Sequence, residues 1–160
     1  MIPHARQQSA RALAFDLGRW SPGPIVASPE RKALETGNEM SAVLDLGVTT
    51  NDDLQEQGFG SVRFRRHSRR RFETTIMNPS RRCSAMSPVT PLQGVSRMRS
   101  IGFFQPPSSN GPPIVVTHGR ILASFLSRLT GEDAFAIWKS LRLPDAMMVD
   151  LERRKFSTIR

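Results

Sequence analysis

Cysteine, histidine and long apolar runs are all scarce in this 160-residue chain, and each scarcity excludes a class of protein. The single cysteine, Cys83, cannot form an internal disulfide, which fits a reducing compartment such as the cytoplasm. One cysteine and three scattered histidines give no metal-ligand spacing, so we expect neither a metal nor another cofactor. No apolar run is long enough to span a bilayer, and residues 1–19 lack the apolar core of a secretory signal.

Acidic residues are also scarce in one region, and this scarcity accounts for the net charge of +9. Residues 61–100 hold ten arginines and one acid, Glu73, whereas bases and acids balance in the rest of the chain. The basic character therefore belongs to one segment. Its densest part comprises Arg63, Arg65, Arg66, Arg69, Arg70 and Arg71.

This basic segment allows three interpretations. It could bind nucleic acid or another polyanion electrostatically, in which case binding would weaken as salt rises. It could be a solvated loop without regular structure, since arginine, serine and proline dominate it. It could also be the product of a compensated frameshift in a GC-rich gene, which the other reading frames would reveal.

Apolar periodicity predicts alternating helices and strands in the first third of the chain. Residues 5–18 predict a short helix, and residues 24–27 a buried strand. Ser28-Pro29-Glu30 indicates a helix start, with Ser28 as the cap, and this helix should run to about Leu44. Residues 45–60 predict a short strand, a turn and a loop.

The periodicity fails over residues 61–111 and returns at Ile114. We expect a single domain over residues 1–160, with 61–111 as a poorly ordered, insert-like segment. The elements expected after it are a strand at 114–117, a helix ended by Gly131, a helix at 132–142, and a hairpin of 146–151 with 155–159. This alternation predicts an α/β fold with a mostly parallel sheet.

Three short motifs fall at strand ends or in the loops that follow, where α/β sheets place their ligands. They are "SPERKALET" (28–36), "LQEQGFG" (54–60) and "VVTHG" (115–119). In order and spacing they resemble the histidine phosphatase superfamily, also called phosphoglycerate mutase-like, and "RLPDAMMVDL" (142–151) resembles its closing stretch. The resemblance covers residues 5–60 and 111–151, about 60% of the chain.

The resemblance implies a three-layer α/β/α fold and phosphoryl transfer through a phosphohistidine. It implies that His118 is the second phosphate-site histidine and that Glu56 is the acid that protonates the leaving oxygen. Lys32 stands where the family usually has a phosphate-binding arginine, with Arg31 beside it, and Gly119 begins a helix whose amides could face phosphate. The partner would be a phosphorylated small molecule or a phosphoprotein.

Two departures from the family pattern shape the functional expectation. No Arg-His-Gly motif, which carries the family's nucleophilic histidine, occurs in the sequence, and the chain begins beyond the place expected for that motif. We therefore expect an N-terminally truncated, incomplete fold. We also expect weak or no phosphomonoester hydrolysis, with non-catalytic phosphate binding or polyanion binding through 61–100 as the alternative.

Overall fold

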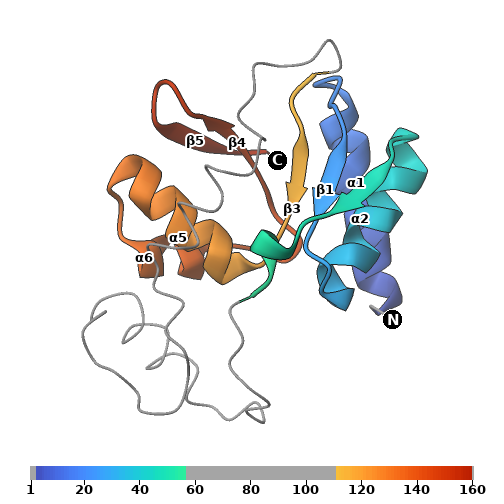
Figure 1. Ribbon diagram of the computed structural model, residues 1–160, viewed down its shortest axis with the longest axis horizontal. Helices are drawn as coiled ribbons and strands as arrows, with labels where there is room; N and C mark the ends of the chain where they lie inside the picture. The colour runs from blue at the N-terminus through green and yellow to red at the C-terminus, as the bar shows by residue number, and fades with distance from the viewer. Residues whose placement is uncertain (1–2, 57–110, 160) are drawn as a thin grey trace, which may run out of the picture.

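Helices and strands alternate along the chain in the computed structural model, which describes residues 3–56 and 111–159 (Figure 1). The first described segment contains α1 (His4–Gly18), β1 (Ile25–Ala27), α2 (Arg31–Leu44), β2 (Val48–Thr50) and the short 3₁₀ helix η1 (Asp52–Leu54). The second contains β3 (Ile114–Val116), α5 (Gly119–Thr130), α6 (Ala134–Ser140), β4 (Ala146–Asp150) and β5 (Lys155–Ile159).

The three short apolar strands form a parallel sheet in the order β2-β1-β3. Ala27, the last residue of β1, pairs with Thr50 of β2 and Val116 of β3, so all three strands end level with one another. Strands β4 and β5 form a separate antiparallel hairpin, in which Met148 pairs with Ser157. The level ends of the parallel strands bring the loops that follow them to one edge of the sheet.

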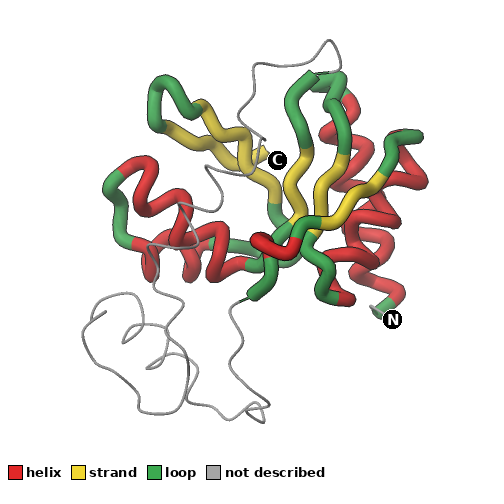
Figure 2. Tube along the Cα trace, viewed as in Figure 1, coloured by secondary structure: helices red, strands yellow, loops and turns green. Residues whose placement is uncertain are grey.

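Alternation along β1 distributes its side chains to the two faces of the sheet. Ile25 is fully buried with Ala14, Leu17 and Met40, which come from α1 and α2. Val26, on the other face, packs in a cluster with Leu54 and with Ile121 of α5. Figures 1 and 2 show this arrangement, with α1 and α2 on one side of the parallel strands and α5 on the other.

A second core lies where α5 packs against α6 and the hairpin. Ala123, Leu126 and Ile137 are buried there, and half-buried side chains from β4 and β5 surround them. The rings of Phe135 and Trp138 stack at a centroid distance of 5.8 Å. Helix α5 therefore joins this core to the parallel sheet, because its Ala123 and Leu126 are buried in this core whereas its Ile121 packs with Leu54 below the sheet end.

The helix boundaries follow local signals in the sequence, with one exception. Gly131 ends α5 in the left-handed region, at φ 85°, which glycine adopts without steric cost. The prediction that Ser28 caps α2 is wrong, because the helix begins later, at Arg31, and its N-cap residue is Glu30. Ser28 lies two residues before the cap and bonds instead to the backbone amide of Glu30 and the ring of His118.

The predicted α/β fold with a parallel sheet is confirmed, and every element expected before residue 56 and after residue 111 is present within a few residues of its expected bounds. The insert-like segment at 61–111 falls almost entirely outside the described residues, so that prediction stays open. Among the helices of 3–56 and 111–159, none has both the length and the apolar content needed to cross a bilayer.

Candidate functional site

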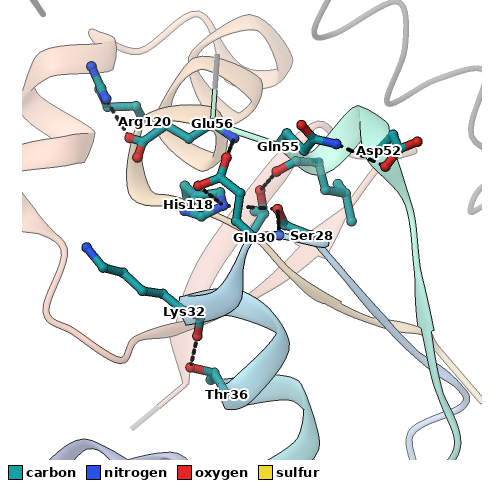
Figure 3. A network of polar contacts seen from close by, with 11 residues as sticks. Ser28, Glu30, Lys32, Thr36, Asp52, Gln55, Glu56, His118 and Arg120 are labelled. Carbon is teal, nitrogen blue, oxygen red and sulfur yellow. Dashed lines mark hydrogen bonds and ion pairs between the residues drawn. The ribbon is translucent and has the colours of Figure 1, made fainter. Parts of the chain in front are cut away.

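The ends of the three parallel strands deliver the polar side chains of the site. Ser28 and Glu30 follow β1, the loop 51–56 follows β2, and Thr117 and His118 follow β3. Because the strands end in register, residues that are distant in sequence meet at this edge of the sheet. Figure 3 shows the side chains of Ser28, Glu30, Glu56 and His118 gathered there.

His118 is the centre of the cluster, with a side chain only 11% exposed. Its Nε2 lies 3.1 Å from the hydroxyl oxygen of Ser28, which is fully buried, and 3.5 Å from one carboxylate oxygen of Glu30. The other Glu30 oxygen accepts a hydrogen bond of 2.5 Å from the backbone amide of Glu56. The imidazole is therefore held between a buried hydroxyl and a carboxylate that is itself fixed by the backbone.

The loop that carries Glu56 is anchored at three points. Asn51 caps η1 by accepting a bond from the amide of Asp53, and Leu54 is fully buried beneath the loop. The hydroxyl of Thr117 donates to the carbonyl oxygen of Leu54 at 3.1 Å, which ties the loop to the end of β3. These contacts fix the backbone next to Glu56 before any ligand is present.

Arg120 in the first turn of α5 binds the carboxylate of Glu56. Its Nε lies 2.7 Å from one Glu56 oxygen, and both side chains are about one-third exposed. A pair this exposed contributes little to stability, about 0–1 kcal/mol. Its main effect is geometric, since it orients the Glu56 side chain and engages one of its two carboxylate oxygens.

The N-termini of two helices meet at the cluster. Glu30 is the N-cap residue of α2 and His118 that of α5, and neither side chain caps its own helix. Each side chain turns toward the other instead (Figure 3). The amides of both first turns therefore lack a side-chain cap from these residues, and both helices carry partial positive charge at this end.

The remaining predicted site residues lie around this cluster. The Lys32 side chain has no ion-pair partner among the described residues, and Figure 3 shows it extending on the same side as Arg120. Arg31 binds Glu35 one turn along α2, and its side chain is 73% exposed. Gly119 begins α5, where an added Cβ would lie 3.4 Å from Leu141 and 3.6 Å from Trp138.

One protein family matches almost the whole chain. The model of the histidine phosphatase superfamily (branch 1) matches residues 4–157, nearly the whole chain. The chain belongs to the histidine phosphatase superfamily. The family predicted from the three motifs is thus confirmed, and the match extends across the segment that showed no resemblance in the sequence alone.

Solved structures confirm that the chain has the fold of this superfamily. A putative α-ribazole-5'-P phosphatase from Escherichia coli is 19% identical with a TM-score of 0.66, covering 99% of this chain and 82% of that one. A mycobacterial glucosyl-3-phosphoglycerate phosphatase in complex with inorganic phosphate is 18% identical with a TM-score of 0.58, covering 83% and 70%. A Plasmodium falciparum phosphoglycerate mutase is 15% identical with a TM-score of 0.56. No curated protein sequence matches significantly.

Three residues of the site in this member of the histidine phosphatase superfamily were not predicted as site residues from the sequence. The sequence predicted Ser28 as a helix cap and Glu30 only as part of the same helix start, and Arg120 lies outside the three motifs. Their roles depend on contacts between residues far apart in the chain, such as the 90 residues that separate Ser28 from His118. No local pattern carries that information.

The buried hydroxyl of Ser28 gives a first prediction. Ser28→Ala should lower the free energy of unfolding by about 1–3 kcal/mol, because the amide of Glu30 and the ring of His118 both lose a partner in a buried setting. Urea unfolding measures the change. Ser9→Ala is the control, since the exposed Ser9 hydroxyl bonds only to a carbonyl of its own helix, and we expect no loss there. Equal stability of the two variants would contradict this role of Ser28.

Proposed function

We propose that this chain is a phosphomonoester-binding member of the histidine phosphatase superfamily that hydrolyses its ligand weakly or not at all. The observation that carries the proposal is the position of His118 between the N-termini of α2 and α5, with Glu56 beside it. The ligand would be a phosphorylated small molecule or a phosphoprotein that binds this cluster through its phosphoryl group.

Several groups favour a phosphoryl group at this position. Helix N-termini attract anions through their free amides and their dipoles, and two of them converge here. Lys32 and Arg120 add positive charge on one side of His118, as the view in Figure 3 shows. Lys32 acts as a point charge, whereas the arginine usual in this family would bind two oxygens at once.

The contacts of Glu56 support its role as the acid of such a site. Arg120 engages one of its oxygens, which leaves the other able to carry a proton to the leaving oxygen of a phosphomonoester. The anchored loop holds this carboxyl group near His118 without any movement of the backbone. Hydrolysis through a phosphohistidine also needs an attacking histidine, however.

Weak turnover is expected because no second histidine lies in the cluster among residues 3–56 and 111–159. His4 is exposed at the start of α1, and His67 lies outside the described residues. The resemblance makes His118 the second phosphate-site histidine rather than the attacking one, and its Nε2 lies beside the hydroxyl of Ser28 and the carboxylate of Glu30. Two carboxylates beside the ring would also repel the negatively charged phosphoryl group of a substrate.

The test is hydrolysis of p-nitrophenyl phosphate at mildly acidic pH, combined with calorimetric titration of orthophosphate. We expect a kcat below about 10⁻² s⁻¹, against the 1–10³ s⁻¹ usual for enzymes. Orthophosphate should still bind, and His118→Ala should weaken that binding about tenfold or more, since one charge-assisted hydrogen bond contributes about 1.5–3 kcal/mol.

Two results would contradict the proposal. Turnover that survives rigorous purification and disappears in His118→Ala would show an active phosphatase. Orthophosphate binding that is unchanged in His118→Ala would place the ligand elsewhere. Arg153→Ala serves as the control, because this exposed residue pairs with Asp150 beyond the end of β4 and should not alter either measurement.

Binding of polyanions through residues 61–100 is the second candidate function. It rests on the ten arginines of that segment against a single acid. The segment lies outside the described residues, so this candidate stays a prediction from charge alone. A steep loss of nucleic-acid affinity with rising salt would distinguish it from binding at His118.

A further inference from the structure

Glu30, Glu56 and His118 are arranged so that they could bind a second kind of ligand besides a phosphoryl group. One carboxylate oxygen from each glutamate and a ring nitrogen of His118 all lie within 4.8 Å of one another. All three residues are half-buried, and they come from three different loops. We propose that these three side chains form a binding site for a divalent transition-metal cation, with zinc as the best-fitting ion.

The geometry is close to what zinc requires. Donor atoms about 2.1 Å from a tetrahedral zinc lie about 3.4 Å from one another. The Nε2 of His118 is already 3.5 Å from a Glu30 oxygen, which is the spacing of two such ligands. One carboxylate oxygen of Glu56 also lies within 4.8 Å of these two donor atoms, so a rotation of the Glu56 side chain can complete the set.

The other contacts of these side chains resemble the outer hydrogen bonds that orient metal ligands. The Glu56 amide holds one oxygen of Glu30, so the second oxygen is directed at His118. Arg120 holds one oxygen of Glu56 in the same manner. Each carboxylate therefore keeps one oxygen for an ion, and the fourth position of zinc would be left for water or another ligand.

The charges at the cluster also favour a cation. Arg120 pairs with the carboxylate of Glu56, whereas the ion pair seen for Glu30 among the described residues is with His118 itself, so a cation at the ring would meet an unneutralised carboxylate. A ring nitrogen with carboxylate oxygens suits zinc and its neighbours in the first transition series. Magnesium and calcium prefer a shell of oxygens, six or more for calcium, and should bind this site far more weakly.

Sequence spacing gave no sign of this site and led us to expect no metal. Glu30 and Glu56 are 26 residues apart, and His118 belongs to the second described segment. Motifs that reveal zinc in a sequence place ligands a few residues apart on one turn or helix. Here the three strand ends bring the ligands together. The inference does not rest on the proposed phosphate function, since it concerns a different ligand.

The experiment titrates zinc into the metal-free full-length chain, in competition with a chromophoric chelator. A Cys83→Ser, His67→Ala background removes other strong ligands that lie outside the described residues. We expect one zinc per chain in this background. His118→Ala should reduce its affinity at least about 100-fold and Glu30→Gln or Glu56→Gln at least about tenfold, given that even outer hydrogen-bond partners contribute 10–100-fold. His4→Ala, at the exposed start of α1, is the control and should change nothing.

Glu30→Gln distinguishes the metal site from the proposed phosphate site. It should lower the affinity for zinc and raise the affinity for orthophosphate. It removes a zinc ligand, but it also removes a negative charge. The repulsion between two unit negative charges about 4 Å apart in water is about 1 kcal/mol. Orthophosphate, measured with a chelator present, should therefore bind about fivefold more tightly to Glu30→Gln while zinc binds more weakly. Circular dichroism checks that every variant is folded.

Three outcomes decide between the two proposals. Zinc binding that is unchanged in both glutamine variants would overturn the metal site, and so would the absence of zinc binding at micromolar concentration. Zinc binding that follows the predicted order, together with no orthophosphate binding, would support the metal site and overturn the proposed function.

Discussion

Leu54→Ala should lower the free energy of unfolding by about 3 kcal/mol and should weaken orthophosphate binding as well. Leu54 is fully buried against Val26, Ile121 and Phe125, and leucine-to-alanine changes in such places remove about 2.7–5 kcal/mol. Its backbone is part of the loop that carries Glu56, and its carbonyl oxygen accepts the bond from Thr117. A cavity beneath this loop should loosen the position of Glu56.

Leu126→Ala is the matched control for this prediction. Leu126 is also fully buried, but it packs with Ala123 and Ile137 in the core on the far side of α5. Urea unfolding should show a similar loss of stability in both variants, whereas calorimetry should show several-fold weaker orthophosphate binding only for Leu54→Ala. Equal binding by the two folded variants would show that the loop does not depend on Leu54.

Gly37→Leu should destabilise the chain by about 3 kcal/mol or prevent it from folding. Gly37 faces the sheet from the middle of α2, and a Cβ placed there would lie 3.3 Å from Ala27 and 3.6 Å from Val48. A leucine side chain has no room between the helix and these strands, so α2 would be forced away from β1. Since β1 leads directly into Ser28 and Glu30, the site would be disturbed together with the fold.

Gly47→Leu is the control for this prediction, because it tests whether replacing any glycine by leucine lowers the stability of the chain. A Cβ at Gly47 would meet no atom within 4 Å, so we expect a change within about 0.5 kcal/mol, as for other exposed positions. Thermal unfolding followed by circular dichroism measures both variants. A small effect at Gly37, or a large one at Gly47, would contradict the close approach of α2 to the sheet.

The order of helices and strands could be predicted from the sequence because each element carries its own signal. Ala10, Ala14 and Leu17 repeat at helical spacing, and they are the buried residues of α1. Gly131 marks the end of α5 and adopts the left-handed conformation that such an end requires. Helical periodicity gives no sign of the close approach at Gly37, where an added Cβ would lie 3.3 Å from Ala27 of the sheet.

The candidate site could be predicted only in part, and only through motifs. The resemblance singled out His118 and Glu56, which the structure brings together with Glu30. The contacts around them come from tertiary packing: Glu30 to the amide of Glu56, Arg120 to its carboxylate, and Ser28 to His118. Lone serines, glutamates and arginines are common on protein surfaces, so their residue types do not reveal such contacts.

The position of β1 in the middle of the sheet has a consequence for the order in which the site forms. Ile25 pairs with Val48 on one side and with Ile114 on the other, and the second pairing closes about four times as much chain. Two doublings of a loop add about 1.2 kcal/mol of closure entropy. Because local contacts form more readily, we expect β1 and β2 to associate before β3 joins them. His118 and Arg120 would then reach Glu30 and Glu56 in a late folding step, so partly folded chains hold the two carboxylates without the histidine that completes the site.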